Sequence, residues 1–403
     1  MKISRQLLVL VAAFFIFSVV SAEAGKRKLS GNHMLKFVEV LNLIDTKYYK
    51  PVEMDACIEK IFQKGVSNCT DVYSFYLNEK EKLRDKEFLE GNFGGVGMKL
   101  GVVKSTDSQN IAVAEVFPDT PAEKAGLLAG DIIVAVSSTG LVAKFVPVQD
   151  VPLSEVVNLI RGRVRTSVAV RVVRNQKQLD FLMVRDSIKH SPISHKNIKP
   201  GIGYIRIDEF SGIAAQDFFV ALSSLTAGGG LAVLIIDVRN NPGGLMFTVL
   251  DILSAFSGGS VLLETRERED QTYFLPTSFL LNGPNSVGEY KHLKVVVLAN
   301  QFSASASEIL ACWFKEDFGA PIIGVKTFGK GLVQNLFDLQ DGGKLHLTIA
   351  EYFVGVKKVP VQGIGVLPTM EVKNPEEWTT SLEADDLQFK KALEVATELL
   401  KSK

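Results

Sequence analysis

Cysteine and histidine are scarce in this chain, and their scarcity excludes several kinds of site. The 403 residues include three cysteines and five histidines. No cysteine pair has the CxxC spacing of a zinc or redox site, and no HExxH pattern of a zinc peptidase occurs. The sequence therefore predicts neither a metal site nor a cofactor.

The chain also lacks an excess of charge of either sign. Lysine plus arginine and aspartate plus glutamate both number 45, so the formal net charge is zero. Such a chain has no surplus of basic residues to attract nucleic acid or an anionic surface. With 46% hydrophobic residues and a length that allows two or three domains, the composition favours a soluble globular protein with a sizeable core.

Long apolar runs are missing except at the N-terminus. Met1–Gln6 is basic, Leu7–Val20 is almost entirely apolar, and Ala22-Glu23-Ala24 offers an A-x-A cleavage site. These are the three parts of a secretory signal peptide. The apolar run is shorter than the roughly 20 residues that a comfortable membrane span needs. We therefore predict a cleaved signal peptide over residues 1–24 and export to a bacterial periplasm or the outside, with an uncleaved anchor as the alternative.

Export bears on the three cysteines. In an oxidising compartment Cys57 and Cys69 are candidates for a disulfide that closes a short loop. Cys312 is then left over, and we expect it to be buried in a helix.

Three regions with different patterns follow the signal peptide. Residues 25–90 carry apolar side chains near helical spacing and are predicted to be a helical N-terminal region. Residues 91–186 contain short β-like runs broken by glycine, and in residues 187–403 apolar runs of strand length alternate with helix-like segments. This alternation predicts an α/β core that ends in a packing helix. The expected core strands are Ile202–Ile207, Ala232–Asp237 and Val295–Ala299, and the expected helices are Ala214–Leu225, Leu245–Phe256 and Asp386–Leu400.

The middle region contains a passage typical of one small β domain. Pro121 suits the first position of a short helix, Gly126 ends that helix, and Asp131 opens a strand. This order resembles the PDZ domain, which binds a peptide as an added strand and holds its terminal carboxylate on backbone N–H groups. A small β domain that binds nothing is the alternative. The residues that the resemblance assigns to peptide binding are Gly95, Val96, Gly97 and Met98.

Two segments of the core carry the chemistry. Ser303–Ile309 places three serines among small residues at the start of a helix-like run, and Lys330 lies between two glycines. A serine nucleophile needs a base, and a desolvated lysine can be that base. No histidine lies between Ser305 and Lys330, but these residues alone do not select one serine among the three.

These segments resemble the C-terminal (tail-specific) processing peptidases, which are serine proteases with a Ser/Lys dyad, and the resemblance covers about residues 35–400. In that family the second serine is the nucleophile, a lysine 25 positions later is the base, and a glutamine four positions beyond orients the lysine. The resemblance therefore implies Ser305, Lys330 and Gln334. It also implies a core of ββα units related to crotonase and Clp protease, with an inserted PDZ-like domain, so the fold class is α/β (α+β overall).

A tetrahedral intermediate needs backbone donors for its oxyanion. The first expected donor is the N–H of Ala306, directly after the nucleophile. Asp237–Gly244 resembles the family's Asp-x-Arg-x-Asn-x-Gly-Gly loop, which supplies a glycine N–H, here that of Gly243 or Gly244. Taken alone, the same segment reads as an ordinary Asn-Pro-Gly turn.

The base must lose its proton to act. Lysine has a reference pKa of about 10.4, and burial among apolar groups lowers it. Phe328, Leu332 and Val333 are the expected apolar neighbours of Lys330.

Other functions fit the residues less well. Gly324–Lys330 matches G-x4-G-K, but Gly331 replaces the hydroxyl residue that holds Mg²⁺ in a phosphate-binding loop. Ser305 lacks the flanking glycines of the α/β-hydrolase elbow, and an acyl-CoA enzyme explains neither the signal peptide nor the PDZ-like region. A non-catalytic PDZ adaptor on an inactive peptidase core is the main alternative.

The prediction is an exported serine endopeptidase that acts on proteins or peptides with free, apolar C-termini. A homo-oligomer and an adaptor are left open by the sequence.

Overall fold

The computed structural model describes residues 30–78, 92–105, 108–149, 151, 153–189, 191–227, 229–257, 261–268, 272–276, 287–340, 342–375 and 386–402. The predicted signal peptide lies outside these residues. The chain divides into two compact units, Met1–Thr70 and Asp71–Lys403. Across the described ranges, no helix combines the length and apolarity needed to cross a bilayer.

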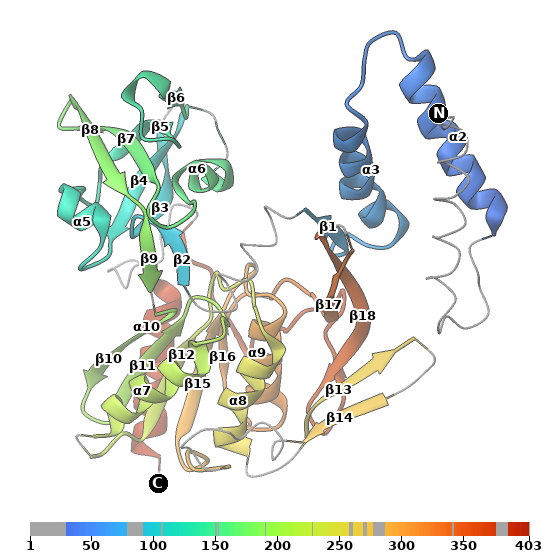
Figure 1. The fold of residues 1–403 in the computed structure, drawn as a ribbon. Helices are drawn as coiled ribbons and strands as arrows, with labels where there is room; N and C mark the ends of the chain where they lie inside the picture. Colours follow the sequence, from blue (N-terminus) through green and yellow to red (C-terminus); the bar gives the residue numbers. More distant parts are fainter. Residues whose placement is uncertain are drawn as a thin grey trace. The chain divides into compact units, whose positions relative to one another are not determined.

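The described part of the first unit, residues 30–70, forms the helices α2 (Gly31–Lys47) and α3 (Met54–Cys69), drawn in blue in Figure 1. Cys57 and Cys69 are both unpaired and both belong to α3. A helix rises about 1.5 Å per residue, which puts their Cα atoms about 18 Å apart, whereas a disulfide needs about 4.4–6.8 Å. The suggested Cys57–Cys69 disulfide is therefore incompatible with the structure. Cys312 is buried in a helix, as expected.

The second unit begins with a strand where the sequence suggested helix. Strand β1 (Phe75–Leu77) pairs antiparallel with β18 (Lys344–Val354). Tyr76 is buried, and the ring of Phe75 stacks on His346 with centroids 4.7 Å apart. These partners lie about 270 positions away along the chain, so no local sequence pattern predicts the strand. The rest of that predicted helical region, residues 25–29 and 79–90, lies outside the described residues.

The PDZ-like region is a small β domain with its own apolar core. Its sheet has the strand order β3-β4-β5-β7-β8, with β6 beside β5, and β2 pairs antiparallel with β9. The predicted short helix is confirmed as α5 (Pro121–Ala125), ended by Gly126 in the left-handed conformation. The other elements are β2 (Asn92–Gly95), β3 (Met98–Ser105), β4 (Ser108–Val116), β5 (Ile132–Ser137), η1 (Val142–Lys144), β6 (Val146–Pro147), α6 (Leu153–Ile160), β7 (Ser167–Arg174), β8 (Lys177–Val184) and β9 (Asp186–Lys189).

The core is built on a sheet of order β10-β11-β12-β15-β16-β20, in which every neighbouring pair is parallel except β10–β11. Its strands are β10 (Ile193–Lys199), β11 (Ile202–Ile207), β12 (Val233–Asp237), β15 (Lys294–Ala299), β16 (Ile322–Gly324) and β20 (Met370–Glu371). Every residue of β11 and β12 is buried, because helices cover both faces. The alternation of strands and helices predicted from the sequence is confirmed.

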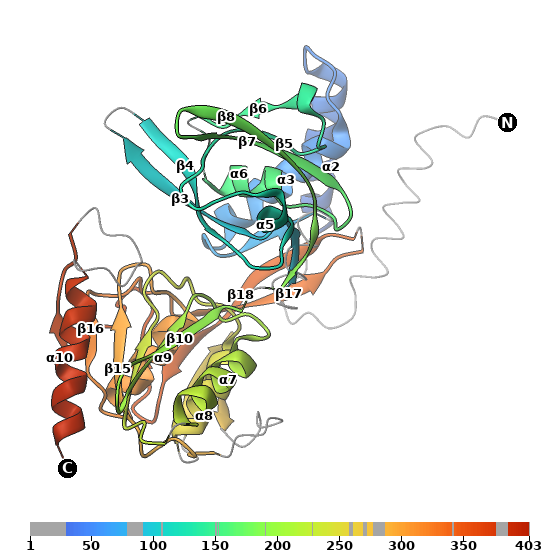
Figure 2. The same cartoon turned by 90° about the vertical axis from the view of Figure 1, so that its left-hand side faces the viewer.

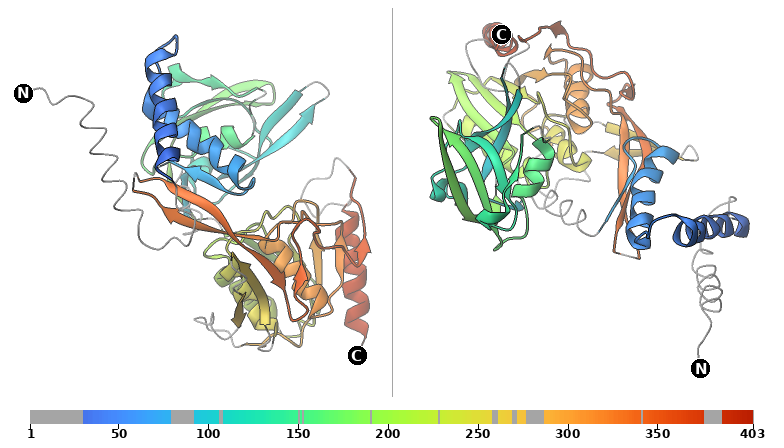
Figure 3. Two further views of the ribbon diagram at one scale, coloured as in Figure 1. Left: turned by 90° about the vertical axis from the view of Figure 1, so that its right-hand side faces the viewer. Right: turned by 90° about the horizontal axis from the view of Figure 1, so that it is seen from above.

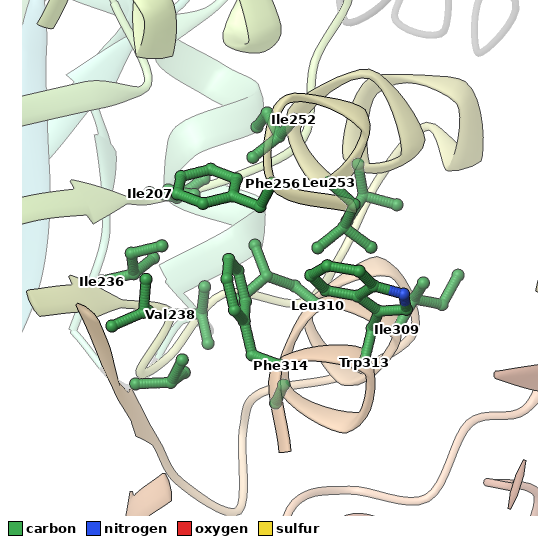
Figure 4. Packing of buried hydrophobic residues seen from close by; sticks show 14 of the residues in the cluster. Ile207, Ile236, Val238, Ile252, Leu253, Phe256, Ile309, Leu310, Trp313 and Phe314 are labelled. Atoms are coloured by element: carbon green, nitrogen blue, oxygen red, sulfur yellow. The ribbon is translucent and has the colours of Figure 1, made fainter. Parts of the chain in front are cut away.

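The two faces of this sheet carry different helices, as Figure 2 shows. Helices α7 (Ala214–Thr226), α8 (Met246–Ser257) and α9 (Ala306–Glu316) pack on one face in one apolar cluster. Within that cluster, side chains of α8 and α9 meet those of β11 and β12 around Phe256 and Phe314 (Figure 4). The predicted C-terminal helix, α10 (Leu387–Lys401), packs on the other face.

A second sheet is organised around the long strand β18. It contains β1, β13 (Val261–Glu267), β14 (Thr272–Pro276), β17 (Leu332–Asp338), β18 and β19 (Val359–Pro360). β18 pairs with β1, β13, β17 and β19, and its hairpin with β17 is seen in Figure 3. Lys330 lies two residues before β17, so this sheet carries one half of the candidate site.

Candidate active site

The three serines at the start of α9 have different environments. Ser303 and Ser307 are fully buried. Their hydroxyls donate to the carbonyls of Val238 at 2.8 Å and Asn241 at 2.9 Å, respectively. Ser305 alone is partly exposed. The structure therefore distinguishes Ser305 from its neighbours in a way that the sequence could not.

Ser305 occupies a strained position at the N-terminus of α9. Its φ is 55° and its ψ is −115°, a backbone conformation that side chains rarely adopt and that costs on the order of 1–3 kcal/mol. The helix that begins at Ala306 directs its positive dipole end at this residue. The local geometry suits a nucleophile whose oxygen becomes negatively charged.

A buried carboxylate, that of Glu308, links this serine to the lysine segment. Glu308 Oε2 accepts the N–H of Ser305 at 2.9 Å and the N–H of Lys330 at 2.8 Å. Glu308 Oε1 accepts the hydroxyl of Thr327 and the N–H of Gly329, both at 2.6 Å. Glu308 is completely buried. One side chain thus holds segments that lie about 25 residues apart in the sequence.

The lysine lies under an aromatic ring. The Nζ of Lys330 is 4.7 Å from the ring centroid of Tyr73, within the range of a cation–π contact. Burial lowers the pKa of Lys330, while the negative charges of Asp71 and Glu308 act in the opposite direction. Phe328, expected to shield the lysine, is itself 56% exposed. The ring over the ammonium therefore comes from a segment that the sequence did not connect with it.

Both glycines beside Lys330 are required by the backbone. Gly329 has a φ of 97°. A Cβ on Gly331 would lie 2.3 Å from the backbone nitrogen of Gln362. The tight turn predicted from the two glycines is present.

The loop after β12 lies against the nucleophile. A Cβ on Gly243 would approach the Cβ of Ser305 to 2.8 Å and the nitrogen of Ala306 to 3.0 Å. The N–H of Gly243 donates to Asn241 Oδ1 at 2.8 Å. The N–H groups of Gly244 and Ala306 have no acceptor among the described residues. Of the two candidate glycines, Gly244 is therefore the one whose N–H is available.

A buried ion network anchors the same loop. Arg239 donates to Asp237 on β12 at 2.6 Å and to Asp386, the N-cap of α10, at 2.8 Å. All three side chains are completely buried. Burial disfavours the charged form of Asp237, but Arg239 outweighs this effect and lowers its pKa. The network ties the C-terminal helix to the start of the candidate oxyanion loop.

The structure does not bring Gln334 onto the lysine through a hydrogen bond. The amide of Gln334 donates to Thr348 Oγ1 on β18 at 3.2 Å. Within the described ranges, no hydrogen bond joins Lys330 Nζ to Gln334 or to the hydroxyl of Ser305. In structures without substrate, catalytic hydrogen bonds are often longer than they are in the substrate complex. The β17–β18 register shifts between Val333 and Gln334, an irregularity that redirects side chains.

The four predicted peptide-binding residues of the PDZ-like region run from Gly95, the last residue of β2, to Met98, the first residue of β3. Val96 is buried, and Gly97 has a φ of 82° with Thr120 close against it. The N–H groups of Val96 and Gly97 have no acceptor in the part of the chain that the structure describes. Met98 begins β3, which is an edge strand. An additional strand can therefore pair there.

Three side chains that the sequence analysis did not assign border the serine and the lysine. Glu308 completes the Ser-x-x-Glu pattern of a capping box, so a local signal for it existed. Tyr352 donates its hydroxyl to the carbonyl of Lys330 at 2.7 Å and lies 3.1 Å from that of Ser305. Neither Tyr352 nor Tyr73 has a local signal, because Tyr352 comes from β18 and Tyr73 from the turn before β1, which pairs with β18.

Comparison with known proteins finds relatives over almost the whole chain. Residues 201–372 match Peptidase family S41, and residues 113–174 match the PDZ domain. The carboxy-terminal processing protease CtpB of Bacillus subtilis is 30% identical over 370 residues, which cover 90% of this chain and 72% of that protein. The carboxy-terminal-processing protease of Bartonella bacilliformis is 29% identical over 374 residues, which cover 91% and 81%.

Solved structures support the same fold. A photosystem II D1 C-terminal processing protease aligns with a TM-score of 0.50 at 24% identity, covering 89% of this chain and 97% of that one. A putative S41 protease from Bacteroides fragilis aligns with a TM-score of 0.57 at 16% identity, covering 94% and 100%. At these identities the likeness concerns the fold.

Proposed function

Since the chain belongs to the carboxy-terminal processing proteases of peptidase family S41, and is thus a serine-type peptidase with a PDZ domain, we propose that it cleaves polypeptides with Ser305 as nucleophile and Lys330 as base. The observation that carries this proposal is the shared carboxylate oxygen of Glu308. The backbone N–H groups of Ser305 and Lys330 both donate to this oxygen, at 2.9 and 2.8 Å. These bonds hold the backbone of the lysine near that of the one partly exposed serine of the motif, which supports Lys330 as the group that takes the serine proton.

In the proposed mechanism the neutral amine of Lys330 accepts the Ser305 proton as the oxygen attacks the peptide carbonyl. The oxyanion of the tetrahedral intermediate accepts the N–H groups of Ala306 and Gly244, and the N-terminal end of α9 stabilises its charge. The Lys330 ammonium then protonates the departing amine. Water hydrolyses the acyl-enzyme, with Lys330 again acting first as base and then as acid.

Gln334 has a supporting role in this proposal. It follows the base by four residues, and its amide donates to Thr348, its cross-strand partner on β18, at 3.2 Å. We propose that Gln334 orients the side chain of Lys330 when substrate is bound. The expected effect of Gln334→Ala is a partial loss of kcat, smaller than that of Lys330→Ala.

The PDZ domain supplies substrate choice. A free C-terminus would add a strand to the exposed edge of β3, and its carboxylate would accept the N–H groups of Val96 and Gly97. Gly95 and Met98 complete the loop on either side. An apolar tail fits this mode, because Met98 and Leu100 on β3 pack on the apolar core of the domain.

The proposal extends to location. The basic, apolar and small-residue segments of residues 1–24 have the order of a secretory signal peptide. We infer that the protein acts outside the cytoplasm, in a periplasm or beyond it. Fractionation of cells that express the full chain, with N-terminal sequencing of the product, tests this inference. An intact N-terminus in the cytoplasmic fraction would contradict it.

The decisive experiment for the activity is proteolysis of an unstructured protein that ends in a short apolar tail. Wild type should cleave it, and Ser305→Ala and Lys330→Ala should not. Equal cleavage by all three proteins would exclude the proposed dyad. Tail binding without cleavage by the wild type would favour a non-catalytic PDZ adaptor.

A second comparison tests tail recognition separately. The same substrate with an amidated C-terminus lacks the carboxylate that the 95–98 loop would hold. We expect much slower cleavage of the amidated form, through a higher KM. Identical kinetics for the two substrates would remove the PDZ domain from substrate selection.

A further inference from the structure

Backbone groups of Ser305 and of Lys330 lie within hydrogen-bond distance of the same two side chains. Their N–H groups bond to Oε2 of Glu308 at 2.9 and 2.8 Å. Their carbonyls face the hydroxyl of Tyr352, which is 3.1 Å from Ser305 O and 2.7 Å from Lys330 O. Both linking side chains are buried.

We propose that Glu308 and Tyr352 form a backbone clamp that sets the spacing between nucleophile and base. Glu308 belongs to the first turn of α9, whereas Tyr352 comes from β18 in the second sheet (Figure 1). The clamp therefore joins the two layers that carry the two halves of the site. This inference rests on the proposed function of Ser305 and Lys330.

The backbone position of Lys330 depends on the clamp more than that of Ser305 does. The carbonyl of Lys330 has no other donor among the described residues, whereas the carbonyl of Ser305 also accepts N–H groups of α9. Lys330 also follows Gly329, whose φ of 97° marks a turn rather than a strand. Without the clamp, the lysine would keep its sequence neighbours but lose the bonds that fix it to the serine.

The tyrosine hydroxyl is suited to a constant role as donor. Burial raises the pKa of Tyr352 well above that of an ordinary tyrosine, and the charge of Glu308 acts in the same direction. The group therefore stays protonated across the range in which a lysine base titrates. The backbone N–H of Tyr352 donates to Gly331 O at 2.9 Å, a bond that a phenylalanine at this position would retain.

Tyr352→Phe removes only the hydroxyl, so it is the test variant. We expect kcat to fall about 10- to 100-fold, because small misplacements of reacting groups are costly, and KM to change by less than about twofold. A loosened Lys330 is better solvated, which moves its pKa back toward the ordinary value. The deficit should therefore shrink as the pH is raised, a change that a purely structural role would not produce.

Tyr290→Phe is the matched control. Tyr290 is a buried tyrosine of the same core, and its ring centroid lies 6.1 Å from that of Phe256. Both phenylalanine variants should lower the thermal midpoint to a similar extent. Only Tyr352→Phe should alter kcat and the pH profile. A Tyr352→Phe protein with the kcat and pH profile of Tyr290→Phe would overturn the clamp.

Glu308→Gln adds a second, independent measurement. Its amide would turn a donor toward N–H groups that now meet an acceptor, and kcat should fall again. If the two side chains set one spacing, the double variant should lose less than the product of the single losses. Fully multiplicative losses would overturn the shared role.

The same assay separates this inference from the proposed function. Cleavage by Ser305→Ala or Lys330→Ala at the wild-type rate would refute the dyad, and the clamp with it. If those two variants are inactive while Tyr352→Phe is unaffected, only the clamp is wrong.

Discussion

Replacing Gly243 by alanine tests whether the loop after β12 lies against the nucleophile. The added Cβ would lie 2.6 Å from the carbonyl oxygen of Ala304, 2.8 Å from Ser305 Cβ and 3.0 Å from Ala306 N. These atoms belong to the main chain or are attached directly to it, so they cannot rotate away. Apolar contacts need about 3.5 Å, and one of the two segments must therefore shift by about 0.5–1 Å.

The expected magnitudes follow from this overlap. A displacement of about 1 Å at reacting groups can cost about 100-fold in rate, which corresponds to about 2.7 kcal/mol in the activation barrier. Stability should also fall. The φ of 105° at Gly243 costs an alanine about 1–2 kcal/mol, and overpacking adds about 1–3 kcal/mol.

Gly319→Ala separates these two effects. Gly319 follows α9, has a φ of 76°, and has open space where the Cβ would be placed. This variant should lose the backbone part of the stability, about 1–2 kcal/mol, and keep its kcat. The measurements are kcat and KM on the tailed substrate and unfolding in denaturant. A Gly243→Ala protein with wild-type kcat would refute the placement of the loop.

Three further predictions concern the base, the buried ion network and the PDZ domain. Burial lowers the pKa of Lys330, and the charge of Asp71 raises it. We therefore expect kcat/KM to rise with pH through a value below about 10.4, and Asp71→Asn to move that rise to lower pH. An unchanged pH profile in Asp71→Asn would exclude an effect of Asp71 on the Lys330 pKa. The pKa of Lys330 is lower in the folded chain than in the unfolded chain, so the unfolded chain binds more protons at this lysine between the lowered value and about 10.4. The contribution of Lys330 to stability therefore increases with pH across that range. Asp386→Ala leaves Arg239 buried with one carboxylate fewer and should cost about 3–5 kcal/mol in denaturant unfolding; a cost below about 1 kcal/mol would mean that the network is not buried in solution. Gly97→Ala would place a Cβ 2.2 Å from Thr120 and should abolish binding of a fluorescent apolar-tailed peptide, measured by anisotropy, while a short internal substrate is still cleaved.

Local patterns in the sequence determined much of this protein. The helices α7, α8 and α10 and the strands β11, β12 and β15 agree with their predicted positions, since hydrophobic periodicity is set within a few residues. The turn at Gly126 and the tight backbone beside Lys330 also follow from single glycines. Even Glu308 had a local signal, because a capping box spans only four residues.

Only the tertiary structure decided how the site is completed. Burial, not composition, separates Ser305 from Ser303 and Ser307, and a bond to Asn241 occupies the N–H of Gly243 while that of Gly244 stays available. Strand pairing brings Tyr73 and Tyr352 to Lys330, and a helix holds Cys57 too far from Cys69 for a bond. Such contacts join residues distant in the chain, so their energies depend on the assembled fold and leave no periodic trace in the sequence.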